Sequence, residues 1–464
     1  MKKGCVGGNL KPSSRIRTIL IPCLFGLILA VLLPTYGWAE DRLPFFERYI
    51  ALLDRHKLVK AAESDIAAAR ERIQSTIGGW YPNLNLSSFY GIEKNKNAEA
   101  DDSKLLAREF DISVTQLLWD FGVTNSQIRT SQLQLEQVQS QLIAARQDVL
   151  LRALTAHVNV RRSYEVLLFA KQSEENIKAQ AALEDALVER GAGLSTDVLQ
   201  AKVTLAGAEA RRVQSEGALE VSLNSYKTLF YEFPQSATAL ELISLPDFLL
   251  PESVDEAVQL AFEGNPNLRA SMIGARIAEE TIETTRATEF YPTFELIGEM
   301  KFKKEVGGTV GSNRESIGKI QFTYPFNLGF TAMNSLRAAE ADSTATSRRV
   351  SDLQDQIEEQ ARNAWSNLQT ARENAKLLRN QANISAEFLE LARKERQLGK
   401  RSLIDVLAGE TNLINSQSDA ASAESDVIIA SISLLSVMGQ LGVEVVSVVN
   451  LSPASKPSVI TKQN

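Results

Sequence analysis

The sequence predicts a mainly helical fold that is built twice along the chain and contributes four short strands. Three observations lead to this prediction: two long proline-free segments rich in alanine and glutamine, two pairs of alternating apolar and polar segments, and landmarks that recur at one spacing. Uninterrupted helical segments of this length are typical of a coiled coil rather than of a globular core. We therefore expect long helices joined to a small amphipathic sheet.

The landmarks define an internal duplication. Three motifs of the first half return in the second half, shifted by 210, 207 and 208 residues. A repeat at nearly constant spacing indicates two copies of one structural unit. We predict repeats at 40–232 and 252–441, a proline-containing linker at 233–251 and a tail at 442–464. The motif pairs are Trp80-Tyr81-Pro82 with Phe290-Tyr291-Pro292, Asp120-Phe121-Gly122 with Asn327-Leu328-Gly329, and Asp197-Val198-Leu199 with Asp405-Val406-Leu407.

The first 39 residues have the pattern of a secretory signal. A basic start precedes an apolar run from Ile19 to Leu33, and small residues at Gly37 and Ala39 provide a cleavage site. An N-terminal membrane anchor is the alternative. Removal of 1–39 changes the net charge from −7 to −12, which argues against a nucleic-acid partner.

Both cysteines, Cys5 and Cys23, lie inside this signal segment, so the mature chain carries no thiol chemistry. Cys23 lies between Pro22 and Leu24, which is not the small-residue setting of a lipid-modified cysteine. No later segment is expected to reach the ~18 apolar residues of a membrane-spanning helix. We therefore expect any membrane insertion to occur through strands.

The strands alternate strictly between apolar and polar residues, which predicts a sheet between two environments. Four strands of ~10 residues cannot close a barrel, and an open edge in lipid would leave backbone groups unsatisfied. Closure must then be shared between chains: two copies give the smallest barrel, and three give twelve strands with a usable lumen. The alternative is a half-buried sheet in a soluble protein. The predicted lipid face comprises Leu84, Leu86, Tyr90, Phe110, Ile112, Val114, Phe294, Leu296, Met300, Phe302, Ile320, Phe322 and Tyr324; the predicted lumen face comprises Asp111, Ser113, Thr115, Glu295, Glu299, Lys319, Gln321 and Thr323.

The two longest helices are expected at about 123–190 and 330–397. At 1.5 Å per residue, ~68 residues span ~100 Å. Each is followed by a glycine-bearing turn, Gly191-Ala192-Gly193 or Leu398-Gly399-Lys400, and by a return helix. Helices of this length predict the wall of a tunnel or a coiled coil.

These features together resemble the TolC-like outer-membrane efflux and secretion family. The resemblance covers nearly the whole mature chain and rests on the duplicated Tyr-Pro hairpin entry, the strand exit at 116–122, and the glycine turn followed by Asp-Val-Leu. It implies a homotrimer in the outer membrane, with a twelve-stranded β-barrel and a coiled-coil α-helical tunnel in the periplasm. Its partners would be outer-membrane lipid, a periplasmic membrane-fusion adaptor and an inner-membrane transporter.

The resemblance also implies a gate at the tunnel tip. By position, Asp197 and Arg401 look like a linking pair, and Asp405 looks like part of a carboxylate ring at the constriction. Two positions depart from the family pattern, because a second constriction carboxylate falls on Ala408 and a linking tyrosine falls on Arg396. The alternative role for Asp197 and Asp405 is charge stabilisation of a helix N-terminus, worth ~0.3–1 kcal/mol. The residues expected to dock the adaptor are Gly191, Gly193, Leu194, Ser195, Gly399, Lys400 and Ser402.

Within that family, the segment 399–407 looks most like the type I secretion branch, whose members export large proteins such as adhesins or toxins with an ABC transporter. The alternative is drug or metabolite efflux with a resistance-nodulation-division pump. A third hypothesis is a periplasmic coiled-coil scaffold without a pore.

An enzyme is the weakest hypothesis. After residue 39 the chain contains two histidines, His56 and His157, and no cysteine. It has no nucleophile elbow, no phosphate loop and no metal-ligand spacing. We therefore expect no cofactor. The first repeat also has Arg55-His56-Lys57-Leu58 where the second has Asn265-Pro266-Asn267-Leu268, so its opening helix is expected to begin differently.

Overall fold

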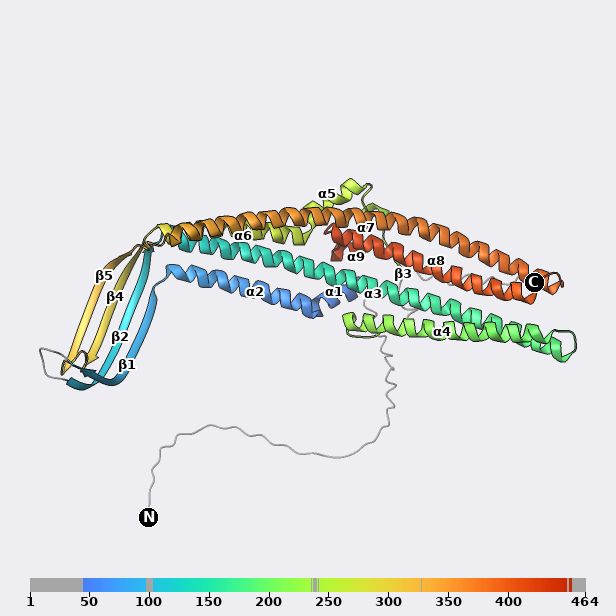
Figure 1. The fold of residues 1–464 in the computed structure, drawn as a ribbon, viewed down its shortest axis with the longest axis horizontal. Coiled ribbons are helices and arrows are strands. Elements are labelled where there is room, and N and C mark those ends of the chain that lie inside the picture. Colours follow the sequence, from blue (N-terminus) through green and yellow to red (C-terminus); the bar gives the residue numbers. More distant parts are fainter. Residues whose placement is uncertain are drawn as a thin grey trace, which may run out of the picture. The chain divides into compact units, whose positions relative to one another are not determined.

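The computed structural model describes residues 45–96, 103–234, 236, 240, 242–326, 328–448 and 450–452. The predicted signal segment 1–39 lies outside these residues, as do Asn327 and most of the tail. Long helices run side by side, and a four-stranded sheet continues from one end of them (Figure 1). This arrangement confirms the predicted fold class of long helices and four strands per chain.

The two repeats have the same order of elements. The first contains α1 (Phe45–Arg55), α2 (Lys57–Ile77), β1 (Asn83–Asn95), β2 (Ser103–Trp119), α3 (Val123–Glu189) and α4 (Ser195–Phe230). The second contains α5 (Val254–Gly264), α6 (Pro266–Phe290), β4 (Thr293–Lys304), β5 (Ser312–Thr323), α7 (Thr331–Gln397) and α8 (Leu403–Val437). Single 3₁₀ turns lie at Gly78–Trp80 and Asp247–Leu249, and the short elements β3 (Leu242–Ser244), α9 (Val443–Val448) and β6 (Asn450–Ser452) complete the described chain.

The long helices α3 and α7 have 67 residues each, which confirms the predicted spans to within a residue at each end. Both end in the same backbone motif. At the first tip, Gly191 N–H donates to Val188 O and Ala192 N–H donates to Leu187 O, each at 2.9 Å. At the second, Gly399 and Lys400 donate to Arg396 O and Glu395 O, also at 2.9 Å. This is a Schellman motif, which satisfies carbonyl groups that the helix end would otherwise leave free.

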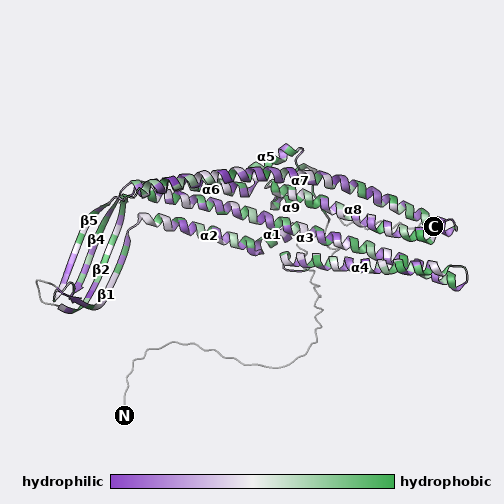
Figure 2. Ribbon diagram, in the orientation of Figure 1, coloured by the Kyte–Doolittle hydropathy of each residue, from purple (hydrophilic) through white to green (hydrophobic). Residues whose placement is uncertain are grey.

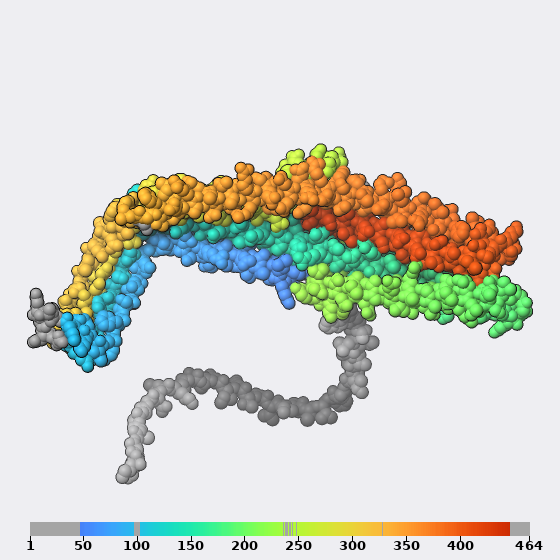
Figure 3. Space-filling view, in the orientation of Figure 1, coloured from blue at the N-terminus to red at the C-terminus, as the bar shows by residue number. Residues whose placement is uncertain are grey.

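The helices pack in two overlapping layers. In the half next to the sheet, α2 packs on α3, α3 on α6, and α6 on α7; in the half next to the tips, α4 packs on α3, α3 on α8, and α8 on α7. The helices α3 and α7 therefore run through both halves, and α7 forms one continuous border (Figure 3). Hydrophilic and hydrophobic residues are mixed along both helices (Figure 2), as expected for helices with several neighbours.

The main apolar core lies where the two layers meet. Leu150 and Leu154 of α3 pack there with Tyr49 of α1 and with Leu434 and Leu435 of α8, and all five side chains are buried. Among the described residues, α8 is the one helix long and apolar enough to cross a membrane by length and composition. The expectation that no such segment follows residue 40 is therefore wrong by that criterion. The physical reason is packing, because much of the apolar surface of α8 lies in this core.

The predicted linker and tail, which are far apart in sequence, meet in the structure. Strand β3 of the linker pairs antiparallel with β6 of the tail, with Leu242 opposite Ser452 and Ser244 opposite Asn450. Ile243 is buried in the main core. The chain thus joins the segment between its repeats to the segment that follows them.

Each opening helix is divided at the same place. Asn265 Oδ1 accepts hydrogen bonds from the backbone N–H groups of Asn267 and Leu268, at 2.9 and 3.2 Å, and so caps α6. In the first repeat, His56 Nδ1 accepts from Leu58 N–H at 3.2 Å and caps α2. The first repeat was expected to begin differently. This is correct for the capping side chain, which is histidine rather than asparagine, but in both repeats the cap follows a short first helix of the same length.

Candidate functional site

The sheet places the predicted lipid-facing residues on one face, except Tyr324, which follows the last residue of β5. Its order is β1-β2-β4-β5, and every neighbouring pair is antiparallel. Because side chains alternate along a strand, residues opposite one another share a face. The register puts Leu84 opposite Val114, Leu86 opposite Ile112, Phe110 opposite Phe302, Ile112 opposite Met300, Leu296 opposite Ile320 and Phe294 opposite Phe322.

The opposite face carries the predicted lumen residues, and its charges are paired. Glu299 lies 3.4 Å from Lys301 and 3.7 Å from Lys319. Lys303 lies 2.9 Å from Glu315 and 4.0 Å from Glu109. The Glu299–Lys301 pair lies within β4, whereas the other three pairs join neighbouring strands and stabilise the sheet. The alternation therefore separates an apolar face from a polar face that neutralises much of its own charge.

Sequence reasoning missed a β-bulge at the end of β2. The register shifts between Leu117 and Trp119, so that Trp119 lies opposite Phe294 and joins the apolar face. Beyond it, the Phe121 ring stacks on Tyr291 with ring centroids 5.2 Å apart. Bulges of this kind redirect side chains at the ends of strands. The result is an aromatic cluster where the sheet meets the helices, a position at which membrane barrels carry aromatic girdles.

The junction between sheet and helix is held by side-chain hydrogen bonds. The buried carboxylate of Asp120 accepts from Gly122 N–H at 3.0 Å and from Thr124 N–H at 2.7 Å, and so caps the start of α3. Phe121 and Gly122 both have positive φ, at 53° and 98°. The motif Asp120-Phe121-Gly122 therefore has a local structural role, which is to turn the chain from strand to helix.

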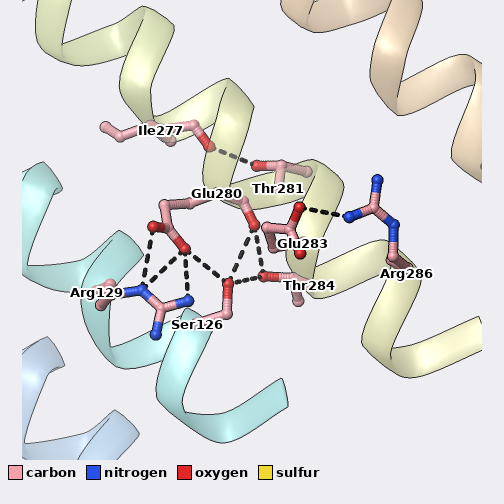
Figure 4. A network of polar contacts seen from close by, with 8 residues as sticks. All are labelled: Ser126, Arg129, Ile277, Glu280, Thr281, Glu283, Thr284 and Arg286. Atoms are coloured by element: carbon pink, nitrogen blue, oxygen red, sulfur yellow. Dashed lines mark hydrogen bonds and ion pairs between the residues drawn. The ribbon is translucent and has the colours of Figure 1, made fainter. Parts of the chain in front are cut away.

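A polar network then joins the two repeats (Figure 4). Arg129 of α3 donates to the Glu280 carboxylate of α6 at 3.0 and 3.1 Å. The Ser126 hydroxyl lies 2.7 Å from that of Thr284 and 3.0 Å from Glu280 Oε2. The hydrogen bond from Arg129 lowers the pKa of Glu280 and raises the pKa of Arg129. This network couples the first turns of α3 to α6.

At the tip, Asp197 pairs with Arg396 rather than with Arg401. The Arg396 guanidinium lies 3.0 Å from Glu184 of α3 and 3.7 Å from Asp197 of α4. Glu184 is only 2% exposed. Arg396, the position that departs from the expected tyrosine, therefore joins the end of α7 to both helices of the other hairpin.

Arg401 and Asp405 make their contacts within the α7–α8 hairpin. Arg401 Nε donates to Glu395 at 2.6 Å, and its guanidinium lies over the Phe388 ring at 5.4 Å. Ser402 caps α8, and its hydroxyl donates to Asp405 Oδ2 at 2.9 Å. Asp197 and Asp405 both lie in the first turn of a return helix. Their positions fit charge stabilisation of a helix N-terminus within the single chain.

A second buried carboxylate lies further from the tip, beyond the first turn of α8. Glu410 of α8 is 5% exposed and forms an ion pair with Arg393 of α7. Asn176 of α3 donates to its other oxygen at 3.4 Å. Sequence reasoning missed Glu184, Glu395 and Glu410, because carboxylates are frequent on these helices and only packing shows which ones are buried, as Glu184 and Glu410 are, or paired with a cation, as all three are. Among the described residues, no group of side chains has a metal-binding arrangement.

The remaining predicted tip residues form the two turns. Gly191 and Gly399 have positive φ, at 74° and 73°, and Leu194, Ser195 and Lys400 are exposed. Gly193 lies close to Val188, where an added Cβ would approach the backbone nitrogen to 3.0 Å. The turns are therefore compact and present their polar groups to solvent.

Comparison with known proteins agrees with this geometry. Residues 49–229 and 257–440 match the family model described as outer membrane efflux protein. The chain is 26% identical over 408 residues to the outer membrane efflux protein BepC of Brucella suis, with 83% of each chain covered. It is 25% identical over 423 residues to the outer membrane protein TolC of Vibrio cholerae, with 89% of this chain and 94% of that protein covered.

Solved structures show the same fold. The outer-membrane channel OprN matches with a TM-score of 0.73 at 20% identity, covering 87% of this chain and 91% of that one. The CmeC outer membrane channel of Campylobacter jejuni matches with a TM-score of 0.72 at 15% identity, covering 88% and 87%. In channels of this fold the barrel closes in the trimer, which accounts for the unpartnered edges of β1 and β5 in the single described chain.

The family model spans most of both repeats, and the strands, long helices and tips have the arrangement that it implies. The chain therefore belongs to the outer membrane efflux protein family, whose members are trimeric outer-membrane channels that extend into the periplasm.

Proposed function

We propose that this channel is the outer-membrane component of a type I secretion machine, which exports protein with an ABC transporter and a periplasmic adaptor. The observation that carries the proposal is the second tip, Gly399 to Leu407, whose sequence resembles that branch of the family. The absence of cysteine after residue 39 adds support, because many multidrug channels of the family are lipid-anchored through a cysteine.

In this function the tip is the gate, and Arg396 is its main link. Its ion pairs hold α7 against α3 and α4, and one of them involves the buried Glu184. Removing Arg396 would leave the buried Glu184 carboxylate with the Gln180 amide, 3.0 Å away, as its remaining described partner and would release α7 from α3 and α4. The closed tip is then a defined state, and an adaptor opens it by replacing these contacts with its own.

Asp405 has a separate role in the proposed gate. In a trimer, three copies of its carboxylate meet at the constriction of the tunnel. A ring of like negative charges in a narrow neck attracts cations and sets the ion selectivity of the current. The position one turn further on is Ala408, so the neck has a single carboxylate ring in this region.

The second candidate function is efflux of small molecules, and the Brucella suis relative, which is named an efflux protein, favours it. The two functions are separated by deleting the gene and restoring it in the source bacterium. Type I secretion predicts that one or a few large proteins disappear from the culture medium and return on complementation. Unchanged secreted proteins together with increased sensitivity to drugs would replace the secretion proposal with efflux.

The gate is tested by single-channel conductance in planar bilayers. We expect Arg396→Ser to increase conductance several-fold and Arg401→Ser to increase it less, because Arg401 is bound within its own hairpin. The matched control is Arg379→Ser, since Arg379 of α7 pairs with Glu424 of α8 in the same hairpin. Asp405→Ala should abolish the preference for cations without opening the tip.

Equal conductance for Arg396→Ser and Arg379→Ser would show that Arg396 does not close the tunnel. A complete absence of current from properly assembled wild-type trimers would instead contradict channel function and favour a scaffold.

A further inference from the structure

The charged residues of the four membrane strands are divided by sign between the two faces. On the apolar face, every charged side chain is basic. On the opposite face lie all the acidic side chains of these strands: Glu93, Glu109, Asp111, Glu295, Glu299 and Glu315. We call the five cations of the apolar face the basic girdle: Lys94, Lys104, Arg108, Lys304 and Arg314.

The basic girdle lies at the hairpin end of the sheet, away from the helices. Lys94 is opposite Lys104, and Arg108 lies between Tyr90 and Lys304 in the neighbouring strands. Along β4, the apolar residues run from Phe294 to Phe302, and Lys304 follows directly. From Phe294 to Phe302, eight steps of ~3.3 Å span ~26 Å along the strand. A strand tilt of ~35–45° reduces this to ~20 Å along the membrane normal, most of the ~25 Å apolar band of outer-membrane barrels. Because the helices extend into the periplasm, the girdle borders the outer leaflet.

The girdle is also chemically unsatisfied within the described chain. All five side chains are exposed, and none forms an ion pair with another described residue. By contrast, Lys301, Lys303 and Lys319 on the other face each lie within 4.0 Å of a carboxylate. The polar face therefore neutralises its cations internally, whereas the cations of the girdle have no counter-ion among the described residues and are available to an external anion.

Aromatic rings hold two of these cations at the edge of the apolar band. The Arg108 guanidinium lies 5.2 Å from the centre of the Tyr90 ring, and that of Arg314 lies 4.9 Å from the centre of the Phe302 ring. Cation–π contacts orient the planar guanidinium group and leave its N–H donors free. Such donors bind phosphate oxygens in pairs.

We propose that the basic girdle binds the phosphate groups of the phosphorylated glycolipid that forms the outer leaflet of the outer membrane. The acyl chains of that lipid would lie on the apolar band directly below, so that one molecule contacts both features. Three copies of the chain would surround the barrel with such cations and anchor it at a defined depth. The proposal rests on the lipid-facing assignment of this face and is independent of the exported cargo.

The test measures binding of lipid A to purified trimers. Trimers in neutral detergent are titrated with bisphosphorylated lipid A and with its dephosphorylated form, and the lipids bound per trimer are counted by native mass spectrometry. The triple variant Arg108→Gln/Lys304→Gln/Arg314→Gln should bind the phosphorylated lipid at least ~10-fold more weakly, because it removes three of the cations that would pair with the phosphate groups. Binding of the dephosphorylated form should be unchanged.

The matched control removes the same charge from the other face of the same strands. Lys301→Gln/Lys303→Gln/Lys319→Gln should retain wild-type affinity for lipid A. Arg108→Lys/Arg314→Lys keeps the positive charges but loses the paired guanidinium donors, so its affinity should lie between those of the wild type and the girdle variant. The girdle variant should also keep wild-type conductance in bilayers without lipid A, which separates this proposal from channel function. Equal loss in both triple variants would overturn the proposal, as would a wild-type trimer that binds both lipid forms equally.

Discussion

At the scale of single residues, the caps of the opening helices show one structural task performed by two side chains. His56 and Asn265 are each the N-cap residue of the second helix in their repeat, and His56 Nδ1 and Asn265 Oδ1 accept from N–H groups in the first turns of α2 and α6. An amide oxygen accepts at any pH, whereas an imidazole nitrogen accepts only when it is unprotonated. Burial, with a smaller contribution from Arg152, lowers the pKa of His56 from 6.5. The folded protein therefore favours the neutral form that acts as a cap.

This difference between the two caps predicts that the start of α2, but not the start of α6, loses stability in acid. Because the pKa of His56 is lower in the folded state, its contribution is complete above about pH 6.5 and decreases as the pH falls below that value. We expect the protection factors of the amides at the start of α2, corrected for the intrinsic pH dependence of exchange, to fall as the pH decreases below about 6.5, reflecting a loss of up to about 1 kcal/mol of cap stability. His56→Asn should remove this pH dependence, with the start of α6 as the internal control. Equal acid sensitivity at both breaks would contradict the assignment.

At the scale of elements, the helix ends are determined by backbone conformation, and the helix faces by packing. Both tips require a residue with positive φ, and glycine occupies that position in each repeat. A side chain in the left-handed region costs about 1–2 kcal/mol. Helix α7 also has two apolar faces. One contains Ala382 and Leu389, which are buried; the other contains Leu377, Ile384 and Leu391, spaced by seven residues and exposed in the single chain.

The turn geometry leads to a prediction for a matched pair of glycine substitutions. Gly399→Ala should destabilise the tip by about 1–2 kcal/mol, because φ at this position is 73°. Gly207→Ala in α4 has open space around the added methyl group and should stabilise the helix by up to about 1 kcal/mol. Hydrogen exchange of the tip amides measures the first effect, and thermal unfolding measures the second. Destabilisation of similar size by both variants would argue against strain at the turn.

At the scale of the whole molecule, a single chain leaves apolar surface on both borders of the helical layer. The exposed seam of α7 lies on one border, and α4 on the other presents Leu199, Val203, Val213 and Val221 to solvent. The strands β1 and β5 lie at the corresponding edges of the sheet. Exposed apolar stripes and unpaired strand edges both indicate contact with a neighbouring chain. The trimer of this family brings one border of each chain against the other border of the next.

The seam can be tested at two adjacent positions of α7. Ile384→Glu places a charge in the exposed apolar stripe and should lower the temperature at which trimers dissociate by several degrees or prevent assembly. Asn383→Glu adds the same charge at the neighbouring exposed position and should have little effect. Semi-native electrophoresis over a temperature series measures both. Equal trimer stability for the two variants would exclude this stripe from the subunit contact.

The sequence alone was sufficient to predict the duplication, the two long helices, the alternation of the strands and the need for several chains. These features depend on local periodicity and on repeated motifs, both of which are visible in one dimension. The bulge before Trp119 was not predicted, because one extra residue changes the register without interrupting the apolar pattern. The pairing of β3 with β6 was also not predicted, since it joins three-residue segments more than 200 positions apart.

Tertiary structure alone decided which charges act together. Many carboxylates occur along α3 and α8, and nothing in their spacing distinguishes Glu184 and Glu410 from those in solvent. Packing of the two hairpins buries these two and places Arg396 and Arg393 against them. The same packing places Arg396 near enough to Asp197 for an ion pair, whereas Arg401 pairs with Glu395 of its own hairpin. Local pattern therefore determines the elements of this channel, whereas the partners at its tip depend on distances in space that the order of residues does not contain.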